Sequence, residues 1–207
     1  MEQGPSMAAI STAKDSDRAG RSIAERVSGI DVGLLVLRLV IGFDLFGHGM
    51  MKFGWFRGSG LGDSIRAQAE TLAFFQYHHH LYFLSWILTL TELSAGIFLM
   101  LGLFTPLGAA GLMGISWQFF AGLQWRGGMY GNASAGIGGF EGSIQLLAAA
   151  TALAFIGPGR LSLDHKLGWR LEGVRWGVVA LILGIGIGSL VLTVFGAGFG
   201  GDLPTGP

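Results

Sequence analysis

The chain has 207 residues, of which 51% are hydrophobic and only 13% are charged, and its mean hydropathy is +0.56. An average soluble domain carries about 25% charged residues, so this composition indicates an integral membrane protein. The 13 basic and 13 acidic residues cancel, which argues against the basic surface of a nucleic-acid-binding protein. Because the sequence contains no cysteine, disulfides, thiolate metal sites and thiol redox chemistry are excluded, and any redox role requires a bound cofactor.

The N-terminal region is polar and mixed in charge over residues 1–29, and it lacks the apolar stretch of a cleavable signal peptide. We therefore expect a cytoplasmic N-terminal extension over residues 1–29. The first membrane span, over about residues 30–53, would then act as its own insertion signal.

Four ionisable side chains interrupt this first apolar segment: Arg38, Asp44, His48 and Lys52. At about 100° per residue, all four fall within a single arc of about 120° on a helix. An ionisable group that faces lipid costs several kcal/mol unless it is paired or reaches the membrane surface. The pattern therefore predicts a membrane helix whose charged side faces protein or trapped water.

Further apolar segments are long enough to cross a bilayer, which requires about 20 residues. We predict them at residues 81–103, 107–123, 140–157 and 174–195. Residues 63–76, between the first two spans, predict a short surface helix. It would be capped by Asp63 or Ser64 and would carry Ile65, Ala69 and Leu72 on one face.

Spans two to four each offer a polar or small stripe, with Glu92 near the middle of the second span, Gln118 in the third and Gln145 in the fourth. The fifth span has no ionisable residue in its apolar body, and it carries Gly184 and Gly188 at the spacing of a packed helix. We therefore expect an all-α integral membrane protein. A four-helix transmembrane bundle would occupy residues 30–173, and a fifth peripheral helix with a short tail would occupy residues 174–207.

The distribution of lysine and arginine predicts the orientation. If the N-terminus is cytoplasmic, the cytoplasmic segments hold eight of these residues, four of them before the first span and the others at Arg160, Lys166, Arg170 and Arg175. The opposite side holds four, at Lys52, Arg57, Arg66 and Arg126. This bias favours a cytoplasmic N-terminus.

Three stretches of the sequence carry short motifs of glycine with charged and aromatic residues. The first stretch lies in residues 37–56, with Gly42, His48-Gly49 and Lys52-Phe53-Gly54; the second comprises Glu92, Gly96 and residues 101–105; the third comprises residues 138–141 and 157–164. In spacing and order, these stretches resemble the DoxX family of small bacterial membrane proteins. The resemblance implies a four-helix core in the bacterial inner membrane. It also implies association with quinone-linked oxidoreductases, respiratory complexes or oxidative-stress complexes. The N-terminal extension and the fifth span depart from the family pattern.

We predict that the polar groups converge on one cavity near the outer face, where they would bind a quinone headgroup or relay protons. The residues are Asp44, His48, Lys52, Glu92, Gln118 and Gln145, with Trp117 as a further candidate and Arg38 as a charge partner. For Glu92, the alternatives are proton transfer and a purely structural role in fixing the helix register. For His48, they are quinone contact or proton relay, and simple pairing with Asp44.

Other cofactor assignments have less support. His78, His79 and His80 point about 100° apart on a helix, so they cannot form one compact metal site, and we interpret them as a polar collar at the membrane interface. We predict no metal site. His48 is the only histidine inside a predicted span, which argues against a haem held by two histidines. No phosphate-binding loop or nucleophile elbow is present.

Three function classes are compatible with these features. They are a membrane subunit of a quinone-linked oxidoreductase, a non-catalytic scaffold of a larger membrane complex, and a small proton-coupled transporter. The sequence shows no paired histidines, no cysteine and no flavin motif. We therefore expect the chain to be at most a subunit of an enzyme, with quinone as the candidate cofactor and other membrane subunits as partners.

Overall fold

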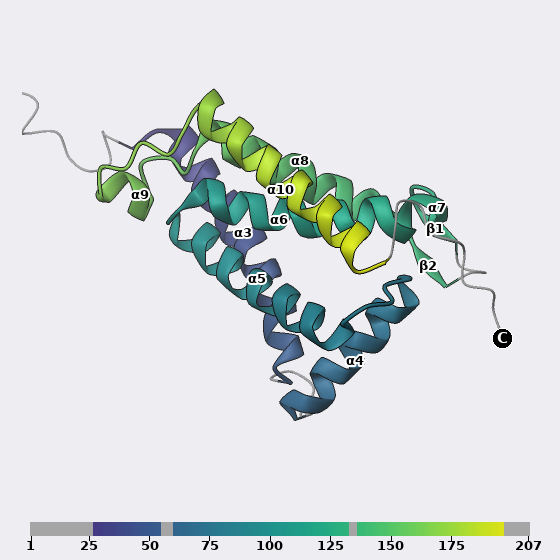
Figure 1. The fold of residues 1–207 in the computed structure, drawn as a ribbon. Coiled ribbons are helices and arrows are strands. Elements are labelled where there is room, and N and C mark those ends of the chain that lie inside the picture. Colours follow the sequence, from purple (N-terminus) through teal and green to yellow (C-terminus); the bar gives the residue numbers. More distant parts are fainter. Residues whose placement is uncertain (1–26, 55–59, 133–135, 197–207) are drawn as a thin grey trace, which may run out of the picture.

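The computed structural model describes residues 27–54, 60–132 and 136–196, and this part of the chain is predominantly helical (Figure 1). The main helices are α3 (Gly29–Lys52), α4 (Leu61–Phe74), α5 (Leu81–Leu101), α6 (Thr105–Phe119), α8 (Glu141–Ile156) and α10 (Val174–Val194). The shorter elements are the π-helix η1 (Phe120–Gln124), α7 (Trp125–Gly127), α9 (Leu163–Lys166), and the strands β1 (Gly131–Asn132) and β2 (Ile137–Gly138). The two strands pair antiparallel, with Gly131 opposite Gly138. Most of the predicted N-terminal extension, residues 1–26, and the predicted tail, residues 197–207, lie outside the described residues.

Each predicted apolar segment forms a helix, and two of the described helices have the length and hydropathy of a membrane span. These are α5 and α10, each with 21 residues. Helix α8 is apolar but has only 16 residues. Helix α3 is longer, with 24 residues, but it contains the four charged residues Asp31, Arg38, Asp44 and Lys52. Membrane crossing by α3, α6 and α8 therefore stays a prediction.

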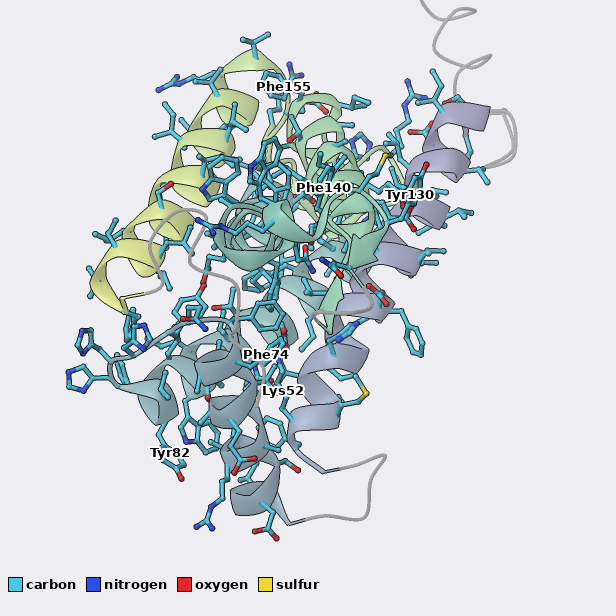
Figure 2. All side chains as sticks on the ribbon, turned by 90° about the vertical axis from the view of Figure 1, so that its right-hand side faces the viewer. Lys52, Phe74, Tyr82, Tyr130, Phe140 and Phe155 are labelled. Carbon is cyan, nitrogen blue, oxygen red and sulfur yellow. The ribbon has the colours of Figure 1, made fainter. Side chains whose placement is uncertain are left out.

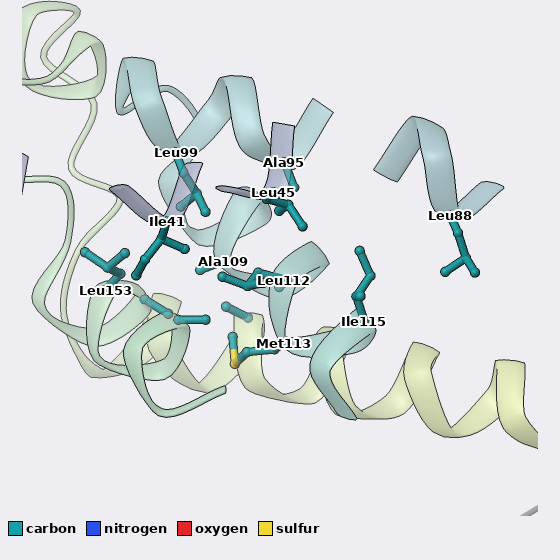
Figure 3. Packing of buried hydrophobic residues seen from close by; sticks show 14 of the residues in the cluster. Ile41, Leu45, Leu88, Ala95, Leu99, Ala109, Leu112, Met113, Ile115 and Leu153 are labelled. Atoms are coloured by element: carbon teal, nitrogen blue, oxygen red, sulfur yellow. The ribbon is translucent and has the colours of Figure 1, made fainter. Parts of the chain in front are cut away.

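Helix α6 lies at the centre of the arrangement (Figure 1). It packs against α5, α8 and α10, while α3 packs mainly on α5. Leu99, Leu112, Met113 and Leu153 meet in the buried hydrophobic core between these helices (Figure 3). Helix α10 covers α6 and α8. The closeness of this contact depends on glycine, because a Cβ added at Gly188 would lie 2.9 Å from the Gly114 carbonyl oxygen.

Two glycines bring α3 and α5 into close contact. A Cβ at Gly42 would lie 2.8 Å from the Gly96 carbonyl oxygen, and a Cβ at Gly96 would lie 2.7 Å from the Gly42 carbonyl oxygen. Further along α3, a Cβ at Gly49 would lie 3.2 Å from the backbone nitrogen of Leu93. The two backbones are therefore close over several turns, and the end of α3 lies beside the middle of α5.

Helix α4 confirms the predicted buried face but not the predicted cap. Ile65, Ala69 and Leu72 are buried as expected. The cap prediction is wrong, because the helix begins two residues earlier, at Leu61, and Gly60 precedes it without a side-chain cap. Asp63 is instead in the first turn, where a carboxylate interacts favourably with the helix dipole.

The segment that follows α8 folds back over the ends of α3 and α6. The Asp31 carboxylate accepts a hydrogen bond of 2.8 Å from the Arg160 backbone N–H. Asp164, which is fully buried, accepts hydrogen bonds from the backbone N–H groups of Phe104 and Thr105, at 2.8 and 3.0 Å, and from the Thr105 hydroxyl at 2.9 Å. Asp164 thus satisfies N–H groups at the start of α6 that have no partner within the helix.

Candidate functional site

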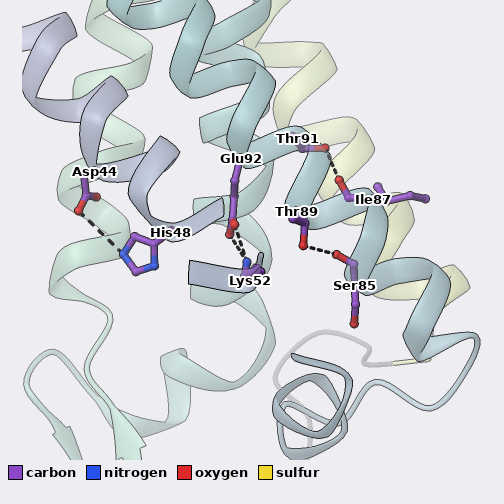
Figure 4. Close-up of polar contacts among 8 residues, drawn as sticks. All are labelled: Asp44, His48, Lys52, Ser85, Ile87, Thr89, Thr91 and Glu92. Carbon is purple, nitrogen blue, oxygen red and sulfur yellow. Dashed lines mark hydrogen bonds and ion pairs between the residues drawn. The ribbon is translucent and has the colours of Figure 1, made fainter. Parts of the chain in front are cut away.

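A buried ion pair joins α3 and α5. The Lys52 Nζ atom lies 2.5 Å from both carboxylate oxygens of Glu92. The side chains are 13% and 5% exposed, respectively. Lys52 is the last residue of α3, where the helix dipole favours a cation. Glu92 lies near the middle of α5, so the pair joins a helix end to a helix centre (Figure 4).

A polar pocket of about 350 Å³ lies next to this pair, between the end of α3 and α4. Lys52 and His48 line it from α3, and polar side chains of α4 line it from the other side: Asp63, Ser64, Gln68 and Thr71. Its volume falls within the range of small-ligand pockets, about 300–1,000 Å³. Figure 2 shows Lys52 toward the end of the molecule that also carries Phe74 and Tyr82, at the opposite end of the view from Phe155.

The sequence interpretation missed these α4 residues, although a signal was present. Asp63, Ala67 and Thr71 follow one another at intervals of four residues, and Ser64 and Gln68 do the same. On a helix, this spacing places the side chains on one face. The sequence shows this face but does not show which helix it meets.

The side chains of Asp44 and His48 point away from the ion pair (Figure 4), although His48 also lines the pocket with Lys52. Their side chains are 54% and 56% exposed, and the Asp44 Oδ1 atom lies 3.9 Å from the His48 Nε2 atom. The prediction that the whole charged arc faces the interior is therefore wrong for these two residues. An arc of about 120° is wider than the contact with one neighbouring helix, so Lys52 faces α5 while Asp44 faces outward.

Gln118, Gln145 and Trp117 do not join the Lys52–Glu92 pair. Gln118 is buried in α6, where its side chain donates to the Gly114 carbonyl oxygen at 3.2 Å and accepts from the Tyr77 hydroxyl at 3.3 Å. Burial raises the pKa of Tyr77 above its ordinary value, so this hydroxyl stays protonated. Gln145 is exposed on α8, and the Trp117 indole N–H donates to the Ser189 hydroxyl at 2.9 Å. The prediction that these residues converge on one cavity is therefore wrong. The sequence shows which residues share one side of a helix, but it does not show toward which neighbouring helix that side is turned.

Arg38 is fully buried, but it is not the charge partner of Glu92. Its Nη2 group donates to the Leu161 carbonyl oxygen at 2.6 Å, and its charge interacts with that of Asp164. The guanidinium also lies against Gly102, whose carbonyl oxygen accepts from the Asp164 backbone N–H at 2.9 Å. The prediction of Arg38 as partner is thus wrong: Lys52 pairs with Glu92, and Arg38 is held by the segment after α8.

Part of the chain matches a known protein family. The DoxX family model matches residues 33–121, which run from the first turns of α3 to η1. The matched region includes Lys52, Glu92 and the whole of α4. No curated protein and no solved structure matches the chain.

Proposed function

Because the chain belongs to the DoxX family of membrane proteins, we propose that it is a membrane subunit of a quinone-linked oxidoreductase, and that its polar pocket receives a quinone headgroup. The observation that carries this proposal is the buried Lys52–Glu92 ion pair at the edge of the pocket of about 350 Å³. Buried charges are costly in a membrane protein, and ionisable residues there commonly mark pathways for protons or substrates.

In the proposed membrane arrangement, α3, α5, α6 and α8 are the four-helix core, and α10 crosses as a fifth helix on the outside. The packing of α3 on α5, of α6 on α5 and α8, and of α10 on α6 and α8 supports this arrangement. The bias of lysine and arginine supports a cytoplasmic N-terminus in a bacterial inner membrane. With this orientation, α4 lies on the outer side of the pocket, and the Lys52–Glu92 pair lies near the middle of α5.

The residues around the pocket suit a quinone headgroup. Lys52 and His48 line the pocket and can donate hydrogen bonds to a carbonyl oxygen. Glu92 does not line the pocket but is paired with Lys52, and it offers a carboxyl group that can hold or release a proton. A bound quinone would supply two-electron, two-proton redox chemistry, with electrons exchanged with a partner subunit. Lys52 fixes the Glu92 carboxylate through two hydrogen bonds. His48, which lines the pocket one turn from Asp44, offers a second group that can pass a proton to a bound headgroup.

A second candidate function is that of a non-catalytic accessory subunit. It is favoured by the large exposed apolar surface of α10, where Ile182, Ile187 and Leu190 are all exposed. Such a surface can pack against another membrane protein as well as against lipid. If this alternative holds, the polar pocket binds no ligand, and the protein acts only through the contact of α10 with its partner.

A pair of matched α4 variants tests the proposed pocket. Ala67 lines the pocket and is exposed, so Ala67→Trp should fill the space without disturbing the helix packing. We expect quinone retained by the protein in native-membrane nanodiscs to fall about tenfold or more, a loss of about 1.4 kcal/mol. Mass spectrometry of the extracted quinone, normalised to protein, measures this. Ala73→Trp, at an exposed α4 position away from the pocket, should retain the wild-type amount. Equal retention by the two variants, or no quinone in the wild type, would favour the accessory-subunit function.

A further inference from the structure

The exposed Asp44–His48 pair lies at a depth where charged groups are rarely tolerated. Helix α5 is long and apolar enough to cross a membrane, and its contacts with α3 set the depth of each α3 residue. Gly42 meets Gly96, and Gly49 meets Leu93. Asp44 and His48 lie between these two levels.

This depth lies inside the hydrocarbon. At about 1.5 Å per residue, Asp44 and His48 fall within about 10 Å of the middle of α5, whereas the hydrocarbon extends about 15 Å on each side of the midplane. Both side chains are more than half exposed, at 54% and 56%. An aspartate side chain is too short to reach the membrane surface from this position, so lipid alone leaves it poorly solvated.

The residues around this pair form a continuous face of α3, which we call the α3 outer face. It consists of Val36, Val40, Phe43, Asp44, Gly47 and His48. On a helix, these residues span an arc of about 140°. Phe43 is 68% exposed, and a Cβ added at Gly47 would meet no atom within 4 Å. The face is thus apolar, has a small residue near its centre and carries one acid and one base.

We propose that the α3 outer face is the interface between two copies of this chain in the membrane. A two-fold axis along the membrane normal places the same face of both copies at the same depth. Asp44 of each copy then lies one turn, about 6 Å along the helix axis, from the level of the partner's His48. Asp44 meets its own His48 across the same rise, so each carboxylate can also reach the partner's imidazole and each acid and base gains a polar partner. A different membrane protein would need a base near Asp44 and an acid near His48 at the same membrane depth. A second copy of this chain has both groups at that depth. Gly47 permits the two helices to approach closely.

This inference does not depend on quinone binding. It rests on the exposure of the α3 outer face and on the membrane depth given by α5. If the protein retains no quinone, the proposed interface between two copies is unaffected. If the protein retains quinone but is a monomer, the proposed interface is overturned and the proposed quinone site is not.

Disulfide cross-linking tests the interface directly, because the wild-type chain contains no cysteine. Val40→Cys, on the α3 outer face, should form a disulfide-linked dimer when native membranes are treated with a mild oxidant. Leu190→Cys is the control, because Leu190 is 59% exposed on α10 and lies outside the proposed interface. We expect the cross-linked fraction of Val40→Cys to exceed that of Leu190→Cys by about tenfold. Equal fractions, or a monomeric mass for the wild type in native nanodiscs, would overturn the proposal.

A photo-reactive phenylalanine analogue in place of Phe43 identifies the occupant of the face. An adduct with twice the mass of the 21.8 kDa chain supports the second copy. An adduct with a different protein, or with lipid only, would overturn the proposal.

Discussion

Replacing Asp164 with alanine is expected to lower the free energy of unfolding by about 3–5 kcal/mol, as found when one partner of a buried charge pair is removed. Asp164 is fully buried and accepts three hydrogen bonds from Phe104 and Thr105. Its removal leaves these donors without an acceptor, and it leaves the buried Arg38 guanidinium without its nearby negative charge. These two consequences act together, so we expect a large loss of stability.

Unfolding in mixed micelles of increasing SDS fraction, together with the Tm in mild detergent, measures this effect. Glu70→Ala is the control because Glu70 is exposed on α4, and a surface change of this kind is usually within about 0.5 kcal/mol of the wild type. Asp164→Asn should be intermediate, since the amide oxygen still accepts from α6 but carries no charge. If Asp164→Ala unfolds at the same SDS fraction and the same Tm as Glu70→Ala, the segment after α8 does not hold α3 and α6 together.

The second large effect is expected at Lys52. Lys52→Met keeps much of the side-chain volume but leaves the buried Glu92 carboxylate without its cation. We expect the free energy of unfolding to fall by about 3–5 kcal/mol. The same unfolding measurement should show much of this loss restored in Lys52→Met/Glu92→Leu, because replacing a whole buried pair with apolar residues is often tolerated.

A matched lysine supplies the control for this prediction. Lys166 is exposed on α9, so Lys166→Met should change stability by no more than about 0.5 kcal/mol. The double variant also gives a coupling energy between Lys52 and Glu92 from the complete mutant cycle. A coupling energy near zero would show that the two side chains do not depend on each other in the membrane.

The sequence predicted the helices well because apolar length and glycine breaks are local signals. The predicted fifth span, residues 174–195, agrees with α10 to within one residue at its end. The third segment differs more, because α6 ends at Phe119 and the chain continues as the π-helix η1. A π-turn is a small change in backbone winding, and hydropathy does not report it.

The candidate site was predicted only in part, since helical angles do not fix helix contacts. The contact between Lys52 and Glu92 was among the predicted partnerships, and the structure confirms it. Arg38 lies only about 40° from Lys52 on the helical wheel, yet it pairs at the other end of α3. The segment that holds it, residues 157–164, was noted in the sequence only for its family resemblance. The Arg160 backbone contacts Asp31 of α3, which is more than a hundred positions away in the sequence. Asp164 contacts Phe104 at the start of α6, about sixty positions away. Helical periodicity does not reveal contacts between residues so far apart in the sequence.

The most direct measurement of the central claim is quinone affinity with and without the Glu92 carboxylate. Glu92→Gln keeps the shape of the side chain and an oxygen for Lys52, and Lys52 borders a polar pocket that can solvate its charge. Glu141→Gln is the matched control, because Glu141 is exposed at the start of α8. A quinone analogue is titrated into nanodiscs that contain each folded variant, over a range of pH.

We expect Glu92→Gln to bind the analogue about tenfold or more weakly than the wild type, which corresponds to about 1.4 kcal/mol. We also expect it to lose pH dependence in binding, because an amide cannot exchange a proton in this range. Glu141→Gln should behave like the wild type. A folded Glu92→Gln protein with the affinity and pH dependence of Glu141→Gln would contradict the proposed quinone and proton site.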